Sequence, residues 1–184
     1  NIVKNGNYIY VLRGSATATF YRYSISGDSW TTLSDTPAVN RYVGLTYNSS
    51  EGYIYVFRGN STYDWWKYDI ATDKFLGPTD LPATPGSGAD LVYYNSKVYF
   101  RRGNNSTSFY NYAPSTGVWT TLAASPGTVN DDTKGVLAGS YIYYYRGSGA
   151  TTFYRYSPLG DSWSTMAVAP AAVSYGSSLS YPGS

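Results

Sequence analysis

Short apolar and aromatic runs alternate with polar turn residues along the whole chain. The runs are about four to six residues long and rich in Tyr, Ile and Val, and clusters of Gly, Ser, Asn, Asp and Pro separate them. This pattern is typical of β-strands joined by tight turns. Helical periodicity does not persist over about ten residues anywhere, so the sequence predicts strands and no helix.

The runs recur at a fixed period. A segment of apolar and Tyr residues that ends in Arg-Gly occurs four times, at steps of 45, 44 and 44 residues: residues 9–14, 54–59, 98–103 and 142–147. A tyrosine, a Trp or Phe, and a proline keep the same spacing: Tyr23, Tyr68, Tyr112 and Tyr156; Trp30, Phe75, Trp119 and Trp163; Pro37, Pro82, Pro126 and Pro170. A period of this length indicates a repeat architecture with four units.

Each unit has room for four strands. In the second unit the runs predict strands at residues 43–48, 53–58, 65–69 and 74–77. Four antiparallel strands per unit, repeated radially, form a β-propeller, an architecture that leaves few sheet edges exposed. The sequence therefore predicts an all-β fold, a four-bladed β-propeller of four-stranded antiparallel blades that forms a single domain over residues 1–184.

The two ends of the chain are expected to share one blade. The chain starts at a run equivalent to the second strand of the other units, and residues 177–181 align with their first strands. We expect this C-terminal strand to pair beside residues 8–12 and to close the ring. The predicted blades are residues 1–36 together with 173–184, 37–81, 82–125 and 126–172. The alternative is pairing with further blades outside this chain.

The repeat resembles a known family. An apolar-Tyr-apolar-X-X-Gly segment, an aromatic-Tyr strand, a turn and a Trp before a Pro are together similar to the kelch repeat, over essentially the whole chain. Kelch repeats usually carry Gly-Gly after the second strand, whereas this chain has Arg-Gly in all four copies, and Phe75 replaces the Trp in the second. The resemblance implies a divergent, kelch-like propeller.

Composition narrows the chemistry and the partners. The chain has no Cys and no His, so disulfides, zinc clusters, thiol nucleophiles and histidine bases are all excluded. A net charge of +2 provides no strong field for nucleic acid or an anionic membrane. No apolar run approaches the roughly 20 residues that cross a bilayer. We expect no cofactor, no metal, no nucleic-acid partner and no membrane insertion.

A low charge content points to an extracellular setting. Charged residues make up 13% of the chain and tyrosine supplies 23 of the 184 residues, a composition more typical of secreted or cell-surface proteins. Because the chain begins at Asn1 with no signal-peptide pattern, we expect a processed product or an excised domain. Glycosylation acceptor motifs fall in predicted loops, at Asn48, Asn60, Asn104 and Asn105.

Four arginines are the first candidate for ligand binding. They occupy equivalent positions in the four repeats: Arg13, Arg58, Arg102 and Arg146. Pointing into a central channel, they could hold a carboxylate, sulfate or phosphate through bidentate contacts. The structural alternative is that each stacks on a Tyr and bonds turn carbonyls, so that the side chains are mostly buried or half-buried. Acids that could pair with them recur in three repeats only: Asp28, Asp73 and Asp161, with Gly117 in the remaining one.

Aromatic side chains are the second candidate. The Trp65-Trp66 pair puts an indole on both faces of one strand, so one of the two could serve as an exposed stacking platform for a sugar ring. Packing between blades is the alternative for both. The Trp or Phe that recurs in each repeat is expected to be buried between blades: Trp30, Phe75, Trp119 and Trp163.

Catalytic groups are sparse. Glycoside hydrolysis needs two converging carboxylates, but Asp131 and Asp132 form the only adjacent acid pair and Glu51 is the only glutamate. The sequence therefore predicts a non-catalytic binding or scaffold domain, with a protein or glycan partner and a role in adhesion. The alternatives are a structural building block of an extracellular fibre or coat, formed by self-association or within a larger parent polypeptide, and a carbohydrate-binding lectin.

Overall fold

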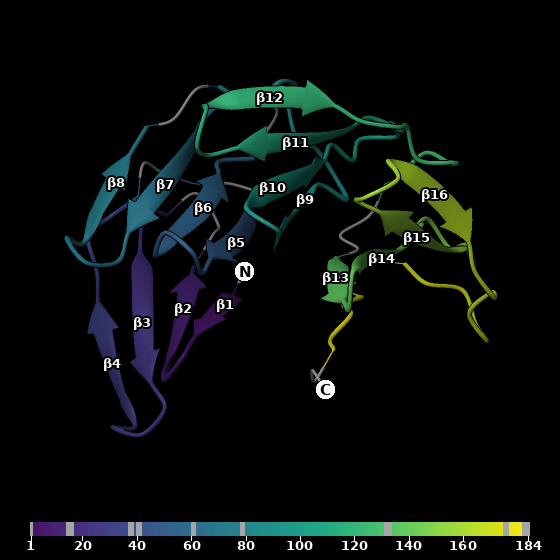
Figure 1. The fold of residues 1–184 in the computed structure, drawn as a ribbon. Coiled ribbons are helices and arrows are strands. Elements are labelled where there is room, and N and C mark those ends of the chain that lie inside the picture. The colour runs from purple at the N-terminus through teal and green to yellow at the C-terminus, as the bar shows by residue number, and fades with distance from the viewer. Residues whose placement is uncertain are drawn as a thin grey trace. The chain divides into compact units, whose positions relative to one another are not determined.

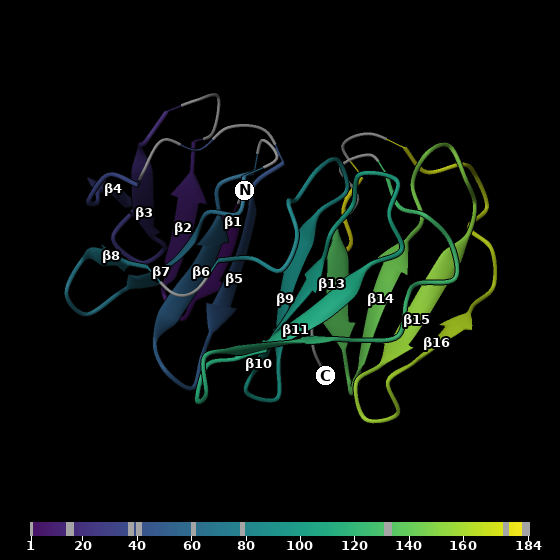
Figure 2. The same cartoon turned by 90° about the horizontal axis from the view of Figure 1, so that it is seen from above.

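The structure, a computed structural model, describes residues 2–13, 17–36, 39, 42–59, 62–77, 80–130, 134–174 and 177–181. Within these residues the chain forms sixteen strands and no helix. It divides into two compact units, Asn1–Thr84 and Pro85–Ser184. Each unit contains two four-stranded sheets, in which the strands pair antiparallel and in chain order (Figure 1, Figure 2).

The first unit holds the first and second sheets. The strands of the first sheet are β1 (Ile2–Asn5), β2 (Tyr8–Leu12), β3 (Phe20–Ser24) and β4 (Ser29–Thr32). Those of the second sheet are β5 (Gly44–Asn48), β6 (Tyr53–Phe57), β7 (Trp65–Asp69) and β8 (Lys74–Leu76). The four strands predicted for the second repeat are confirmed to within one residue at each end. Strands β1 and β5 lie next to one another.

The second unit repeats this plan. Its third sheet is made of β9 (Asp90–Tyr94), β10 (Lys97–Arg101), β11 (Phe109–Ala113) and β12 (Val118–Thr121). Its fourth sheet is made of β13 (Gly135–Ala138), β14 (Tyr141–Tyr145), β15 (Phe153–Ser157) and β16 (Ser162–Thr165). Strands β9 and β13 are neighbours, as β1 and β5 are in the first unit. The predicted all-β class with four four-stranded antiparallel sheets is confirmed.

The predicted pairing of the C-terminal strand is wrong. Ile2–Asn5 forms a first strand of its own, which pairs with β2 in the register Val3↔Tyr10 across the two-residue turn Gly6-Asn7. That edge of β2 is therefore filled, and residues 177–181 form no strand. Gly6 has a φ of +56°, which makes the tight turn possible. The prediction rested on the aromatic runs and did not take this glycine into account.

Inside the first unit, one face of the first sheet packs on the second sheet. Strand alternation places Tyr10, Leu12 and Phe20 on one side of the first sheet, and this set is called the Phe20 face. It packs on the second sheet, where the Phe20 ring lies edge-on to two rings. The distance between ring centres is 4.9 Å to Tyr68 and 5.6 Å to Phe75. These contacts lie in the hydrophobic core of the first unit, and the residues that form them are buried or half-buried.

The second unit contains the same interface. Phe109 of the third sheet meets Tyr156 of the fourth at 4.7 Å and Trp163 at 5.1 Å. Phe109 is equivalent to Phe20 in the repeat, and the pair Tyr156 and Trp163 is equivalent to Tyr68 and Phe75. The period of about 44 residues thus encodes an interface between neighbouring sheets as well as the strands themselves.

The recurring Trp position is not uniformly buried, contrary to the prediction. Phe75 and Trp163 are half-buried against the preceding sheet, and Trp119 is half-buried beside Phe100 and Tyr112 of its own sheet. Trp30 is 61% exposed. The Trp30 ring contacts rings of its own sheet, and its centre lies 5.0 Å from that of the Tyr23 ring. Burial of this position requires a preceding sheet, which no described residue supplies to Trp30.

Candidate binding site

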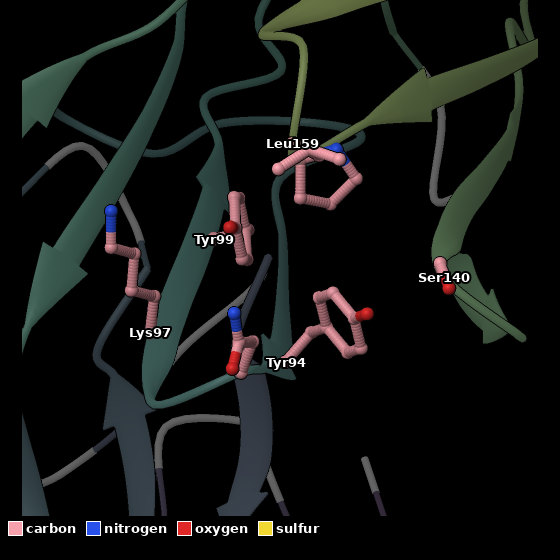
Figure 3. A pocket seen from close by; sticks show the side chains of 7 residues that line it. Tyr94, Lys97, Tyr99, Ser140 and Leu159 are labelled. Carbon is pink, nitrogen blue, oxygen red and sulfur yellow. The ribbon is translucent and has the colours of Figure 1, made fainter.

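A hollow of about 360 Å³ opens at one end of the second unit. It is formed by turns and strand ends of the third and fourth sheets and is lined by Tyr94, Asn95, Lys97, Tyr99, Ser140, Pro158 and Leu159. Figure 3 shows the rings of Tyr94 and Tyr99 side by side, with Leu159 above them and with Lys97 and Ser140 on opposite sides. Its volume lies within the range of about 300–1,000 Å³ that is usual for small-ligand sites.

The β9–β10 hairpin places three of the lining side chains. Asn95 and Ser96 both have positive φ, +47° and +59°, which is the requirement for a type I′ turn. Such a turn pairs Tyr94 directly with Lys97 across the hairpin. The aromatic ring, the amide of Asn95 and the ammonium group of Lys97 are therefore presented together by a tight and rigid turn.

Tyr99 lies deeper in the hollow. The residue is 3% exposed, its ring stacks on Phe109 with ring centres 6.1 Å apart, and the Tyr156 ring lies tilted to it at 6.0 Å. Burial is the largest cause that raises the pKa of Tyr99 to about 12, and the charges of Tyr94 and Asp161 act in the same direction. At neutral pH the hydroxyl is protonated, as in an ordinary tyrosine, and it is able to donate a hydrogen bond.

The lining set has binding groups but no acid. The seven residues that line the hollow offer aromatic faces, an amide, a hydroxyl and an ammonium group, and none of them is Asp, Glu, His or Cys. Across the described part of the chain, no group of three or more acidic residues lies close enough to hold a metal ion. The adjacent acids Asp131 and Asp132 lie outside the described residues.

A buried cation lies at the other end of β10, the strand that begins at Lys97. Arg101 is 2% exposed, and its guanidinium carbon is 4.2 Å from the centre of the Tyr144 ring, which belongs to the neighbouring sheet. It donates from Nε to the carbonyl of Gly88 at 3.2 Å and from a terminal nitrogen to the carbonyl of Tyr145 at 3.3 Å. Burial lowers the pKa of Arg101, while the charges of Tyr144 and Asp90 act in the opposite direction.

Asp90 balances this charge. It is 5% exposed and faces Arg101 across the β9–β10 pair. Its carboxylate accepts a hydrogen bond from the backbone N–H of Gly135 at 2.8 Å and lies 3.5 Å from the Lys134 ammonium group. These groups link the third sheet to the fourth. Arg101 and Asp90 are buried and Lys134 is partly exposed, so their contacts stabilise the interface between the two sheets.

Arg101 was not predicted from the sequence. The repeats share an arginine one position later, whereas the residues equivalent to Arg101 are Leu12, Phe57 and Tyr145. The features that the four copies share therefore do not include Arg101. It could have been recognised as a charged residue at a position that is apolar or aromatic in the other three copies.

The four repeated arginines occupy equivalent backbone sites. Each backbone N–H donates to the carbonyl six residues later, at 3.2, 3.0, 3.3 and 3.0 Å for Arg13, Arg58, Arg102 and Arg146. Arg58, Arg102 and Arg146 are half-buried, as predicted, whereas Arg13 is exposed. Arg58 pairs with Asp64 at 2.9 Å, and Arg146 donates from Nε to the carbonyl of Thr128 at 3.3 Å. These contacts favour the structural use, and a shared anion stays a prediction.

The repeated aspartates accept hydrogen bonds from tyrosines and not from the repeated arginines. Tyr23, Tyr68 and Tyr156 donate their hydroxyls to Asp28, Asp73 and Asp161 at 2.7, 2.8 and 2.7 Å. All three aspartates have positive φ, and so does Gly117 at the fourth equivalent turn. Asp73 and Asp161 also accept the backbone N–H of Ser34 and of Ala123, which follow the last strand of the preceding sheet. The pairing of these acids with the arginines, considered from the sequence, is therefore not observed.

The Trp65–Trp66 pair packs into sheets. Trp65 is 3% exposed and stacks on Tyr55 at 5.1 Å, so it does not provide the exposed platform. Trp66 is half-buried and packs against the core of the first unit. The sequence left both packing and a sugar platform open for this pair, and the contacts observed are those of packing. Aromatic rings line a hollow at Tyr94 and Tyr99 instead, two residues that the sequence did not single out.

The four glycosylation candidates differ in their surroundings. Asn48 ends β5, is 1% exposed and donates to Glu51 at 2.9 Å, which does not fit an acceptor in a loop. Asn104 and Asn105 are exposed turn residues with φ of +55° and +54°, and glycosylation there stays a prediction. Asn60 lies outside the described residues.

These sheets define the class of protein. The chain is an all-β protein built of four four-stranded antiparallel blades of the β-propeller type. Among solved structures it is similar to "Structure of YjhT", with a TM-score of 0.75, 16% sequence identity and a match over 93% of this chain. The chain spans 66% of that structure, just under two thirds of its length. At this identity the similarity shows the fold alone.

Comparisons of sequence add no family. No protein-family profile matches the chain, and no curated protein matches it either. The kelch-like character of the repeats therefore stays an expectation from the residues. In the described part of the chain, no segment forms a helix of the length and apolarity needed to cross a membrane.

Proposed function

We propose that the chain is a non-catalytic binding domain that takes a glycan in the hollow of the second unit. The observation that carries this proposal is the combination of two tyrosine rings with Asn95, Lys97 and Ser140 in a hollow without an acid. A sugar ring has apolar faces that suit an aromatic ring, and hydroxyls that pair with amide, ammonium and hydroxyl groups. The missing carboxylates argue against acid–base chemistry at this site.

The setting of this domain is part of the proposal. We place it outside the cell or on its surface, within a kelch-like propeller, because low charge, abundant tyrosine and turn-borne binding groups agree with such a role. A propeller scaffold holds its turns rigidly, so a ligand meets side chains that are already ordered. A partner protein whose polar side chain enters the same hollow is the second candidate.

A glycan array followed by calorimetric titration tests this proposal. The wild-type chain should bind a subset of the glycans. Removing one wall of the hollow with Tyr94→Ala, or its ammonium group with Lys97→Ala, should weaken the affinity for those glycans at least tenfold, about 1.4 kcal/mol.

Matched controls lie outside the lining set. Tyr63 is 51% exposed and Lys74 is exposed, so Tyr63→Ala and Lys74→Ala should leave the affinity unchanged. The absence of any glycan ligand would contradict the proposal, and so would binding that Tyr94→Ala and Lys97→Ala leave intact.

A further inference from the structure

One face of the first sheet is open. Its residues are called the Trp30 face and comprise Ile9, Val11, Tyr21, Tyr23 and Trp30. Trp30 is 61% exposed and the other four are half-buried. Ile2, which pairs with Val11 and so shares this side of the sheet, is 69% exposed.

The same positions are covered elsewhere in the repeat. Val56 is the counterpart of Val11 and is fully buried, and Tyr68 is the counterpart of Tyr23 and is 1% exposed. Leu45 is the counterpart of Ile2 at 9%. The difference follows from the neighbour, because the second sheet receives the Phe20 face there. On the first sheet, Val11, Tyr21 and Trp30 instead line an apolar hollow of about 260 Å³.

The fourth sheet has the complementary face. Its residues are called the Phe153 face and comprise Tyr143, Tyr145 and Phe153, all half-buried. Phe153 is equivalent to Phe20 and Phe109, which are 0% and 1% exposed. Tyr143 stacks on Phe153 at 5.6 Å, as Tyr10 stacks on Phe20 at 6.0 Å. The Phe153 face therefore repeats the arrangement that the Phe20 face has inside the first unit.

The likeness extends to the charged residue on each face. Arg22, on the side of the first sheet that carries Phe20, lies 4.7 Å from the centre of the Tyr8 ring. Arg155, on the side of the fourth sheet that carries Phe153, lies 4.4 Å from the centre of the Tyr141 ring. The Phe153 face thus has the same stacked aromatic pair and the same neighbouring arginine as the Phe20 face, which packs on the second sheet.

We propose that the Trp30 face is an assembly surface, and that its occupant is the Phe153 face of a second copy of this chain. In this contact, Phe153 of one copy meets Tyr23 and Trp30 of the other. Two contacts inside the chain serve as templates: Phe20 with Tyr68 and Phe75, and Phe109 with Tyr156 and Trp163. The contact is head-to-tail, because two different faces are used, so each pairing leaves one face of each copy available. The inference does not depend on the glycan hollow.

Two charged variants test this contact. In Trp30→Asp the Trp30 face is blocked and the Phe153 face is intact, and in Phe153→Asp the reverse holds. Sedimentation velocity of the wild-type chain should show a mass that rises with concentration above the 20.2 kDa monomer. Each variant alone should stay monomeric. An equimolar mixture of the two should form a one-to-one dimer and nothing larger, because just one competent pair of faces remains.

Controls keep the test decisive. Val118 is 55% exposed and belongs to neither face, so Val118→Asp should associate like the wild type. Circular dichroism reports folding, and Tyr143→Asp blocks the same face in case Phe153→Asp does not fold. A wild-type chain that stays monomeric at all concentrations would overturn the proposal. Variants that associate alone, or a mixture of folded variants that does not dimerise, would overturn it as well.

Discussion

Among individual residues, the buried tyrosines show how the same side chain is used in different ways. Tyr156 is fully buried and its hydroxyl donates to Asp161 at 2.7 Å. Tyr144 is 1% exposed, and its hydroxyl has no hydrogen-bond partner among the described residues. A buried polar group without a partner costs about 1–3 kcal/mol. The Tyr144 ring compensates for this cost because it receives the Arg101 guanidinium on its face.

Removing these two hydroxyls should have opposite effects on stability. Tyr144→Phe keeps the ring and removes the group without a partner, so it should raise the free energy of unfolding by about 1 kcal/mol. Tyr156→Phe removes a hydrogen bond to a charged group and should lower that energy by about 1–3 kcal/mol. Urea denaturation of both variants measures the difference. A loss of stability in Tyr144→Phe equal to that in Tyr156→Phe would contradict the assignment.

Tyr99 should make stability sensitive to alkaline pH. An unfolded tyrosine has a pKa of about 10, and burial raises the pKa of Tyr99 to about 12 in the folded chain. Its contribution to stability is therefore fully present below pH 10. It is lost as the pH rises from 10 to 12, because the unfolded state releases the proton first.

The measurement is the free energy of unfolding as a function of pH in the wild type and in Tyr99→Phe. The variant should lose stability less steeply between pH 10 and 12, since one of the tyrosines with a raised pKa is gone. Identical slopes in the two proteins would show that the Tyr99 hydroxyl is open to solvent in the folded chain.

In the strands and sheets, the interface between neighbours explains which aromatic residues hold the fold together. Trp163 packs on Phe109 of the preceding sheet and donates from Nε1 to the carbonyl of Ala123 at 2.9 Å. Trp30 holds the equivalent position but contacts Tyr21 and Tyr23 of its own sheet. One position in the repeat is therefore structural in one sheet and exposed in another.

Truncation should reveal this contrast. Trp163→Ala should lower the free energy of unfolding by about 3–5 kcal/mol, through the cavity left between two sheets. Trp30→Ala, measured at a dilution where the chain is monomeric, should lower it by less than about 1 kcal/mol. Thermal unfolding of both variants gives the comparison. Equal losses would mean that Trp30 is covered in the free chain.

The strands were predictable because every copy repeats them, whereas the hollow was not. The apolar runs located β5 to β8 to within one residue, and the missed β1 has just four residues of mixed polarity. Asn95 and Lys97 belong to a hairpin turn that differs from its counterpart in the second sheet. Periodicity detects what the copies share, while the hollow is built from the turn residues in which they differ.

At the scale of the whole protein, the proposed binding hollow in the second unit and the proposed contact between the Trp30 and Phe153 faces of two copies would work together. Such a combination would display many copies of one weak site, and multivalent display raises the overall affinity without any new contact. This consequence joins the two functions that the sequence left open, a binding domain and a building block of an extracellular assembly.

The measurement that tests the central claim most directly is NMR mapping of a glycan identified on the array. Titration of the isotopically labelled chain should shift the ring signals of Tyr94 and Tyr99 and the backbone amides of Asn95 and Lys97, all of which line the hollow. The signals of Tyr63 and Trp30 should stay in place. Shifts that cluster around Trp30 or the repeated arginines, with Tyr94 and Tyr99 unmoved, would contradict the account.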